Sequence, residues 1–311
     1  MIKIVSYDEQ WPLLFSKEAE SLKNILQENV IDLHHVGSTS VPDLASKPKI
    51  DVIVVVKKPE NAIASLKNSQ YTYRGEWNVP FKFGFTKRSG YPINLHIYEE
   101  GHSEIEVNLI FRDHLKNNMQ SKAEYEALKL KLATDPTSAQ KEDHHFFSTY
   151  TLGKDSFIRN VLKQENYDGK RFLKTTHHFE WNEYHRIRKE LIFDASGLKY
   201  DPHHSSLTDP NHHHFILYHG VQIVTALHVE FLNSTTAALR ILATDKAFQN
   251  KGYASFSMRL MEKWIKSQEI KTIKLHAEPR ERPFYEKLGY CDVDFDDVCI
   301  VKDYINLGKT L

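Results

Sequence analysis

The stretch that decides the fold reads Leu239-Arg-Ile-Leu-Ala-Thr244, followed closely by Gln249-Asn-Lys-Gly-Tyr-Ala254. The first segment is an apolar run of strand length, and the second is a short turn that contains a glycine. After the turn we expect a helix over 253–268 and a strand over 272–277. The next segment, Pro283-Phe-Tyr-Glu-Lys-Leu-Gly-Tyr290, is predicted to form an aromatic helix. This alternation of strands and helices indicates an α/β domain.

The turn at 249–254 has the residues of an anion-binding helix start. Backbone N–H groups point outward at a helix N-terminus, where the helix dipole also favours negative charge. Side chains would block the close approach of a pyrophosphate, so small residues are needed, and Gly252 and Ala254 supply them. The helix that follows is amphipathic, because Ala254, Met258 and Ile265 share one face. The segment therefore predicts a pyrophosphate site beside a buried strand.

A second cluster makes this motif more specific. The pattern of Gln or Arg, two free positions, Gly, one free position, then Gly or Ala arises by chance about once per thousand positions. Here Phe284-Tyr-Glu-Lys-Leu-Gly-Tyr290 follows on the helix after the next strand. Together the two motifs resemble the GNAT superfamily of N-acetyltransferases over about 171–311. The tail is similar to the subfamily of bacterial ElaA proteins, on the residues Phe295, Asp297, Ile300, Lys309 and Leu311.

This resemblance implies acetyl transfer with acetyl-CoA as co-substrate. The backbone amides of the turn would hold the coenzyme pyrophosphate, at Gln249, Asn250, Lys251, Gly252, Tyr253 and Ala254. The pantetheine arm would pair with the end of the preceding strand, at Leu242, Ala243 and Thr244. Tyr285 stands where the family places the acid that protonates the departing thiolate. A phenol, with a reference pKa of about 10, suits that step, although a packing aromatic is the alternative role for Tyr285.

Other catalytic groups are expected on the strands before the turn. Glu230, on the strand before Leu239, is the first choice for the base that deprotonates the acceptor amine. His228 and Asp245 are alternatives to it, and all three could equally be ordinary polar residues at strand edges. Glu278 departs from the family, whose members often carry Asn or Gln near that position. A carboxylate there could repel the coenzyme phosphates.

The acceptor is expected to be an amine of a small molecule. Its half-site is predicted to lie between 183–193 and the histidine-rich loop 200–214. Acidic residues over 292–297 indicate a cationic amine, and a solvated acidic surface explains them equally well. The sequence therefore specifies the coenzyme half of the site far better than the acceptor half.

Length and charge limit the remaining function classes. The chain has 311 residues, enough for two domains, and 41 basic residues balance 41 acidic ones, so no global field recruits nucleic acid or a membrane. The N-terminus lacks the apolar core of a signal peptide, and no apolar stretch is long enough to span a bilayer. Two cysteines indicate a reducing compartment, so we expect a cytoplasmic protein. Histidine pairs such as His144-His145 point to opposite faces of a strand, and we expect no metal site.

The N-terminal half has its own pattern of helices and strands. Helices are expected over 12–28, 60–69, 123–132 and 154–162, and strands over 50–56, 94–98 and 104–110. The residues resemble the GrpB family in the segments Tyr7-x-x-x-Trp-Pro-x-x-Phe15, Val36-Gly-Ser-Thr-Ser-Val-Pro42, Lys47-Pro-Lys-Ile-Asp51 and Phe111-Arg-Asp113. That match spans about 3–163, and a polar linker lies near 164–170. We therefore predict domains at 1–166 and 171–311.

The resemblance to the GrpB family implies a fold related to the nucleotidyltransferases. Their hallmark is Gly-Ser on a loop, here Gly37-Ser38, followed on a strand by Asp-x-Asp or Asp-x-Glu. Alternate residues of a strand face the same side, so both carboxylates can hold Mg²⁺. This chain has Asp51, but the partner position is Ile53. A Mg²⁺ site is therefore limited to one ion at best, with Glu104 or Glu106 as the second ligand.

A polar set around this motif is predicted to bind an anion or a nucleotide. Its members are Gly37, Ser38, Lys47, Asp51 and Arg112. Lys47 and Arg112 could hold phosphate or carboxylate, because cations beside a Gly-Ser loop favour anions. The alternative for Arg112 is a structural ion pair with Asp113. Asp51 on an apolar strand is costly unless it has a partner or a task.

These patterns predict an α/β (α+β) chain of two folds. The N-terminal fold is a nucleotidyltransferase-like mixed sheet with helices, and the C-terminal fold is a mixed, mostly antiparallel GNAT sheet flanked by helices. Three hypotheses stay open for function. Acetyl transfer is the first, and Mg²⁺-dependent nucleotide chemistry in the N-terminal half is the second. The third makes the N-terminal half a recognition module that brings a substrate or partner to the acetyltransferase.

Overall fold

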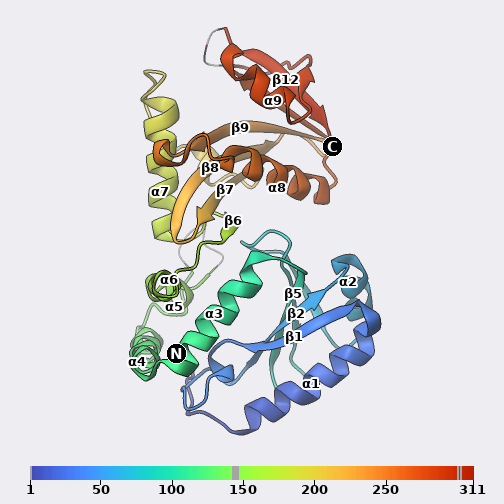
Figure 1. The fold of residues 1–311 in the computed structure, drawn as a ribbon, viewed down its shortest axis with the longest axis vertical. Coiled ribbons are helices and arrows are strands. Elements are labelled where there is room, and N and C mark those ends of the chain that lie inside the picture. The colour runs from blue at the N-terminus through green and yellow to red at the C-terminus, as the bar shows by residue number, and fades with distance from the viewer. Residues whose placement is uncertain (1, 142–146, 300, 302) are drawn as a thin grey trace. The chain divides into compact units, whose positions relative to one another are not determined.

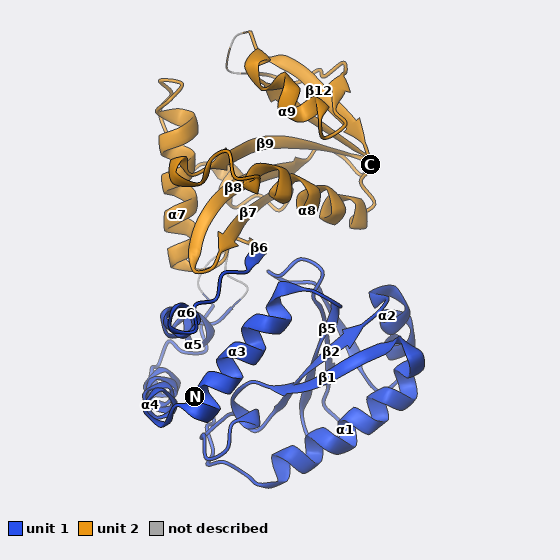
Figure 2. Cartoon of the chain, in the orientation of Figure 1, with its two compact units in different colours: residues 1–171 blue, residues 172–311 orange. Residues whose placement is uncertain are grey.

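Two separate sheets organise the chain in the computed structural model (Figure 1), which describes residues 2–141, 147–299, 301 and 303–311. The chain divides into unit 1, Met1–Arg171, and unit 2, Phe172–Leu311 (Figure 2). Each unit combines helices with a sheet of mixed strand direction, which confirms the predicted α/β (α+β) class. It stays a prediction that residues 1–166 and 171–311 form domains that fold on their own. No described helix is both long and apolar enough to cross a membrane.

Unit 1 is built on a sheet of five strands in the order β1-β2-β5-β4-β3. The strands are β1 (Val30–Val36), β2 (Ile50–Val56), β3 (Thr72–Gly75), β4 (Phe83–Lys87) and β5 (Ile93–Glu99). The helices are α1 (Gln10–Leu26), α2 (Pro59–Lys67), α3 (Ser103–Asn117), α4 (Met119–Thr134), α5 (Thr149–Leu152) and α6 (Asp155–Gln164). Short 3₁₀ turns are η1 (Gln27–Asn29) and η2 (Ser38–Ser40). β2 and β5 run parallel, and the other pairs run antiparallel.

Side chains of β2 alternate between the two faces of the sheet, and this places Asp51 on the face opposite the core. Ile50, Val52 and Val54 are fully buried in a core with Trp11 and Leu22 of α1. Each such burial stabilises the fold by about 1.5–3 kcal/mol. Because successive side chains of a strand point to opposite faces, Asp51 lies on the face away from this core. The polar site of unit 1 is built on that second face.

One predicted strand of unit 1 is wrong. The alternating apolar residues over 104–110 predicted a strand, whereas the structure has the helix α3 there. The His102 imidazole caps this helix by accepting a hydrogen bond from the Glu104 amide at 3.2 Å. Val107 and Leu115 are buried with His114, a spacing that follows the helical repeat over four turns. The period-two pattern was short, and the longer helical pattern decides the structure.

Unit 2 is built on a sheet of seven strands in the order β11-β12-β10-β9-β8-β7-β6. The strands are β6 (Lys170–Lys174), β7 (His212–His219), β8 (Gln222–Phe231), β9 (Thr236–Thr244), β10 (Thr272–Ala277), β11 (Cys291–Asp292) and β12 (Ile305–Thr310). The helices are α7 (His178–Arg188), α8 (Tyr253–Ser267) and α9 (Arg282–Glu286). Short turns are the π-helical η3 (Lys189–Phe193), η4 (Ser205–Leu207), η5 (Lys246–Phe248) and η6 (Pro279–Glu281). The helix predicted over 253–268 and the strand predicted over 272–277 are confirmed as α8 and β10.

Strands β9 and β10 run parallel and then separate. Their pairing runs from Thr272↔Thr236 to Leu275↔Leu239, while β9 continues to Thr244. The backbone edge of β9 beyond Leu239 is therefore open toward β10. Arg240 is one extra residue on β9, because His228 pairs with Ile241 and Val229 pairs with Leu239. Such a bulge bends the strand and redirects its side chains, a feature common beside active sites.

Helices α7 and α8 cover opposite faces of this sheet. On β7, His213 packs against Trp264 of α8 with ring centroids 5.0 Å apart. Its neighbour His214 shares a hydrogen bond with Tyr184 of α7, with Nδ1 and the phenol oxygen 2.6 Å apart. Adjacent strand residues point to opposite faces, so the two helices lie on the two sides of the sheet.

Candidate functional site

The turn between β9 and α8 is fixed by side-chain hydrogen bonds at both of its ends. The Gln249 amide nitrogen Nε2 donates to the Thr244 carbonyl at 3.0 Å, which ties the turn to the end of β9. The Tyr253 hydroxyl lies 2.8 Å from His219 Nδ1 and anchors the helix start to β7. Gly252 has φ +81°, and apart from its two chain neighbours no heavy atom of the described residues lies within 4 Å of the point that a Cβ would occupy, so this side of the turn is open space. The first amides of a helix have no acceptor within the helix.

The turn borders a hollow of about 700 Å³ in unit 2. Its lining includes Leu242, Ala243, Thr244, Gln249, Asn250, Gly252, Tyr253, Ala254 and Tyr285. Of the predicted coenzyme residues, Lys251 is the one outside this lining, because its ammonium turns back and donates to the Ala247 carbonyl at 2.9 Å. The structure therefore brings the predicted strand end, the predicted turn and the predicted acid to one hollow.

Tyr285 is held in its protonated form by its surroundings. It lies on α9 and is buried, with ring contacts to Phe284 and Tyr290 at 5.0 and 5.7 Å. Burial raises the pKa of Tyr285, and the nearby Glu281 charge and the Tyr304 phenol raise it further. A phenol with a raised pKa stays protonated near neutral pH, so it can donate a hydrogen bond to a thiolate as the thiolate forms beside it.

The predicted bases lie apart from this hollow. Glu230 pairs with Ala238 at the far end of β8, whereas the end of β9 at Thr244 pairs with Thr225. Its carboxylate accepts a hydrogen bond from Arg240 Nε at 2.6 Å. None of Glu230, His228 and Asp245 belongs to the described lining of the hollow.

His228 and Asp245 have structural partners of their own. His228 is buried, and its Nε2 lies 2.8 Å from His212 Nδ1. Burial and the neighbouring His214 hold the pKa of His228 well below its usual range, so the ring is neutral. Asp245 caps η5 through the Ala247 amide at 3.0 Å and binds Arg186 of α7 at 2.7 Å. The Arg186 ion pair therefore joins α7, which contains part of the predicted acceptor half-site, to the segment just before the turn at 249–254.

Two of the four acidic residues over 292–297, Asp292 and Asp297, are paired within the unit. Asp297 binds the Arg240 guanidinium and lies 3.0 Å from His276 Nε2. Asp292 binds Arg282 at 2.7 Å. These pairs neutralise both carboxylates, so the acidic run does not by itself identify a cationic acceptor.

In unit 1, Asp51 sits at the centre of a polar cluster. Its Oδ1 accepts a hydrogen bond from Asn94 at 2.8 Å and lies 3.8 Å from Lys49 Nζ and 3.6 Å from His96 Nε2. Lys49, His96 and Asn94 hold the pKa of Asp51 well below its usual range, against the burial that raises it. A Cβ on Gly37, at φ +70°, would come within 3.0 Å of the Asp51 carboxylate, so the loop packs directly on it.

The other predicted members of the anion set divide into two groups. The Lys47 ammonium lies 3.8 Å from the centre of the Tyr150 ring, and Ser38 lies beside the buried Tyr125 hydroxyl. Arg112 instead binds Asp113 through two nitrogens at 2.7 and 2.9 Å and donates to the His35 carbonyl at 3.2 Å. The guanidinium is occupied in this way, which favours the structural ion pair over an anion ligand for Arg112.

Both parts of the chain match known protein families. Residues 1–164 match the family described as GrpB protein. The chain belongs to the GrpB family. Residues 173–290 match a second family, described as Acetyltransferase (GNAT) family. The GrpB domain is thus joined to an acetyltransferase domain, which confirms both predicted resemblances, while the ElaA-like tail stays a prediction and its Ile300 lies outside the described residues.

Several known proteins are similar to the GrpB domain. UPF0157 protein YqkA of Bacillus subtilis is 35% identical over 168 residues, which cover 51% of this chain and 46% of that protein. UPF0157 protein BH1888 of Halalkalibacterium halodurans is 33% identical, over 53% of this chain and 83% of its own length. The crystal structure of the conserved protein GrpB from Enterococcus faecalis is 33% identical, covers 52% of this chain and 96% of that chain, and has a TM-score of 0.46. The chain therefore spans less than half of YqkA and most of BH1888.

Two charged residues at the coenzyme hollow were missed by the sequence reasoning. Arg280 and Glu281 belong to its lining, together with the apolar Leu191 and Ile192. Burial and the Glu278 charge raise the pKa of Glu281. Glu278 itself, expected to repel the coenzyme, binds Arg280 at 2.5 Å and accepts from the Tyr304 hydroxyl at 3.4 Å.

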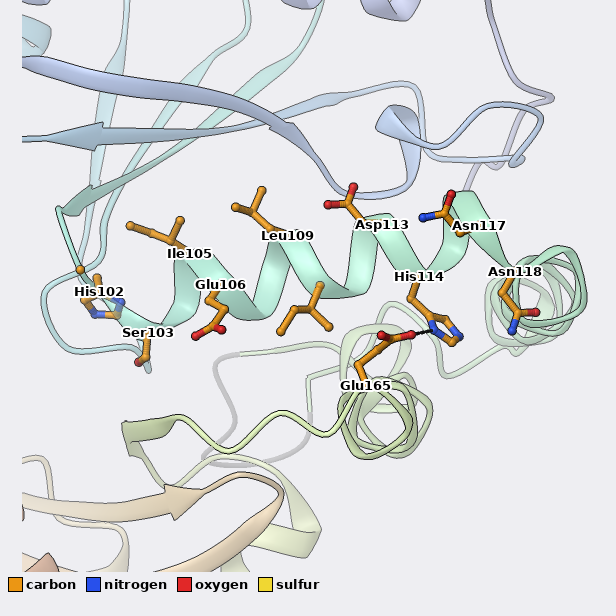
Figure 3. Close-up of a pocket in the computed structure, with 12 residues that line it drawn as sticks. His102, Ser103, Ile105, Glu106, Leu109, Asp113, His114, Asn117, Asn118 and Glu165 are labelled. Carbon is orange, nitrogen blue, oxygen red and sulfur yellow. Dashed lines mark hydrogen bonds and ion pairs between the residues drawn. The ribbon is translucent and has the colours of Figure 1, made fainter.

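The GrpB domain also has a hollow of about 740 Å³ along α3 (Figure 3). Apolar Ile105 and Leu109 line it together with Asp113 and His114, and His114 Nδ1 lies 2.6 Å from Glu165 Oε1. None of the predicted anion residues belongs to its described lining. This hollow is therefore separate from the Asp51 cluster.

The donor chemistry around Asp51 does not fit Mg²⁺. Within residues 2–141, 147–299, 301 and 303–311, no group of three His, Cys, Asp or Glu could hold a metal ion. Glu104, one expected second ligand, binds Arg171 at 2.6 Å, and the Lys49 ammonium lies beside the carboxylate that would have to bind the cation. The pair His144-His145 lies outside the described residues.

Proposed function

We propose that the acetyltransferase domain moves the acetyl group of acetyl-CoA to the amine of a small molecule. The amine nitrogen attacks the thioester carbonyl carbon, the carbon–sulfur bond breaks, and the nitrogen loses a proton. The departing thiolate takes up a proton, so the products are an acetamide and the free coenzyme thiol. The match of residues 173–290 to the acetyltransferase family supports the reaction type.

The open edge of β9 is the observation that carries this proposal. The strand loses its β10 partner after Leu239 and leads straight to the turn whose open glycine is Gly252. An extended pantetheine arm can pair with that backbone edge, as an added strand would. The pyrophosphate at its end would then reach the amides at the start of α8.

Tyr285 is our proposed acid for the thiolate. It lines the same hollow as the strand end and the turn, and its raised pKa keeps the proton available. The predicted base Glu230 stays a prediction. Because Arg240 binds its carboxylate at 2.6 Å and it lies outside the described lining, we expect Glu230→Gln to lower kcat less than a Tyr285 variant.

The test is release of coenzyme thiol from acetyl-CoA in the presence of a panel of small amines. Tyr285→Phe should lower kcat about a hundredfold or more, since general acid catalysis contributes about 10²–10⁴, while acetyl-CoA affinity stays within about twofold. Tyr290→Phe is the matched control, because it is a buried tyrosine that contacts Tyr285 and lies outside the described lining. Equal kcat values for the Tyr285→Phe and native chains would exclude Tyr285 as the acid.

For the GrpB domain, the chemistry of Asp51 argues against Mg²⁺-dependent nucleotidyl transfer. One carboxylate beside a lysine cannot hold the paired ions of that reaction, so no step is assigned to a metal. A binding role, as a recognition module or an anion site, agrees better with the residues. A cytoplasmic location stays a prediction.

A further inference from the structure

A ring of lysines surrounds Asp51 on the polar face of the GrpB domain. Lys49 precedes Asp51 by two residues, and its Nζ lies 3.8 Å from the carboxylate. Lys82 stands directly before β4, in which Gly84 pairs with His96, and His96 lies 3.6 Å from Asp51. Lys49 stands directly before β2, and the Asp51 charge also acts on Lys82, so both lysines reach Asp51 from the starts of these two strands.

Two more lysines reach the cluster from outside the sheet. The Lys47 and Lys154 ammonium groups lie 3.8 and 4.7 Å from the centre of the same Tyr150 ring. Tyr150 is buried on α5, so the ring is a fixed platform for both cations. All four lysines are partly buried, and none is a freely solvated surface side chain.

The lysines are close enough to oppose one another's charge. Burial and then Lys49 lower the pKa of Lys47 to about 8, and burial and then Lys47 lower the pKa of Lys154 to about 8. Burial also lowers the pKa of Lys82, while the Glu104 and Asp51 charges raise it. Glu104 is already bound to Arg171 at 2.6 Å, which leaves Asp51 as the shared carboxylate of the cluster. Crowded cations in a partly desolvated space favour an anionic ligand.

The loop beside Asp51 is rigid and adds polar groups. The Ser40 hydroxyl donates to the Gly37 carbonyl at 2.6 Å, and the Thr39 hydroxyl donates to the Lys49 carbonyl at 3.2 Å. Within the described part of the chain, His96 Nδ1 is buried without a hydrogen-bond partner. The other ring nitrogen, Nε2, faces the Asp51 carboxylate at 3.6 Å.

We propose that this cluster binds a phosphate group directly, with Lys47, Lys49, Lys82 and Lys154 in the place that divalent cations take in metal-dependent nucleotide enzymes. Four ammonium groups around one carboxylate leave an excess of positive charge for a phosphate oxyanion. The same excess repels Mg²⁺. Asp51 positions Lys49 and His96 in this site and does not bind the phosphate itself.

The test is calorimetric titration of the whole chain with inorganic pyrophosphate in the presence of EDTA. A Gly252→Glu background keeps the coenzyme turn of the acetyltransferase domain from contributing. We expect saturable binding without metal, weakened about tenfold or more by Lys154→Gln, since a charge-assisted contact is worth about 1.5–3 kcal/mol. Lys67→Gln is the matched control, because the exposed Lys67 also lies 4.7 Å from a tyrosine ring, that of Tyr73. That control should bind as the parent chain does.

Asp51→Asn separates this proposal from a metal site. The substitution keeps the shape of the side chain and removes the negative charge, so pyrophosphate should bind as tightly as before or more tightly. Binding that requires Mg²⁺ and disappears in Asp51→Asn would overturn the proposal, as would binding unchanged by Lys154→Gln. Equal affinity for citrate would overturn the assignment to phosphate. A parallel titration with ATP distinguishes a nucleotide from free pyrophosphate as the ligand, because a site for a nucleotide should bind ATP more tightly than pyrophosphate.

Discussion

Single residues decide which predicted contacts form around the coenzyme hollow. Gly252 has positive φ and open space where a side chain would stand, whereas Gly37 has positive φ and Asp51 packs within 3.0 Å of its missing Cβ. The roles of the turn at 249–254 and of Tyr285 were both predicted from the resemblance to the acetyltransferase family. Lys251 was predicted with them through its backbone amide, and its ammonium bonds to the Ala247 carbonyl at 2.9 Å. A motif locates a turn, but where each side chain points depends on atoms outside the motif.

Glu281 should make acetyl-CoA affinity depend on pH. Glu281 lines the hollow, and burial and the Glu278 charge raise its pKa, so it takes up a proton at a higher pH than an ordinary glutamate does. Charged Glu281 repels the coenzyme phosphates, so Glu281→Gln should bind acetyl-CoA a few-fold more tightly, about threefold, at pH 8. The difference between the two chains should shrink as the pH falls through the raised pKa.

A phosphate of the coenzyme itself titrates at about pH 6. This titration affects the native chain and Glu281→Gln equally, so it cancels when their affinities are compared. Isothermal titration at about pH 5 and about pH 8 gives the ratio of their Kd values. A ratio that stays constant between about pH 5 and 8 would show that Glu281 does not face the phosphates.

At the scale of elements, alternating apolar residues predicted one strand correctly and another wrongly. Helix α8 was predicted from an apolar face that continues over the whole helix, and alternate residues of β10 are buried as its sequence indicates. The segment 104–110 was predicted as a strand from a few alternating residues, and the cap at His102 and the buried face of α3 make it a helix. Lys82 and Lys154 could not be predicted as partners of Asp51, because strand pairing and the α5–α6 segment bring them together from distant parts of the chain.

Strand β7 contains a histidine whose burial costs stability. The His213 ring packs against Phe231 and Trp264, and its Nε2 is buried with no hydrogen-bond partner among the described residues. His213→Phe keeps a flat ring and removes the unsatisfied atom, so it should raise the free energy of unfolding by about 1 kcal/mol at about pH 7.5. In scanning calorimetry this corresponds to a rise of about 3 °C in the transition of unit 2.

The gain from His213→Phe should grow in acid. Burial, with Lys174 next, lowers the pKa of His213 to about 4 from its ordinary value near 6.5. The folded state therefore resists protonation that the unfolded chain accepts, and stability present above about pH 6.5 is lost as the pH falls toward 4. His203→Phe, at an exposed histidine of the same unit, is the control and should change the transition little. A native chain that is as stable as His213→Phe at acid pH would contradict this assignment.

At the scale of the whole molecule, the chain has no net charge, but positive charge is concentrated around Asp51. The 41 basic and 41 acidic residues cancel over the chain, yet four lysines gather at Asp51 in the GrpB domain. The net charge gave no reason to expect nucleic acid or a membrane, and it could not show this cluster, because charge positions follow from the fold.

The two family matches fall on the two units of the structure. Residues 1–164 lie in unit 1 and residues 173–290 lie in unit 2. Both resemblances were recognisable from local motifs, since those motifs form turns and strand ends that chemistry restricts to few residue types. The acceptor amine was not recognisable, because its predicted half-site consists of helices and loops whose charges are paired within unit 2.

The central claim is that the turn at Gly252 binds acetyl-CoA, and calorimetric titration of the whole chain tests it most directly. We predict saturable binding by the native chain and a loss of about tenfold or more in Gly252→Glu, which places bulk and negative charge at the phosphate position. Gly197→Glu is the matched control, because Gly197 also has positive φ and no heavy atom within 4 Å of its Cβ position, and should bind normally. No binding by the native chain, or equal binding by Gly252→Glu, would contradict the claim.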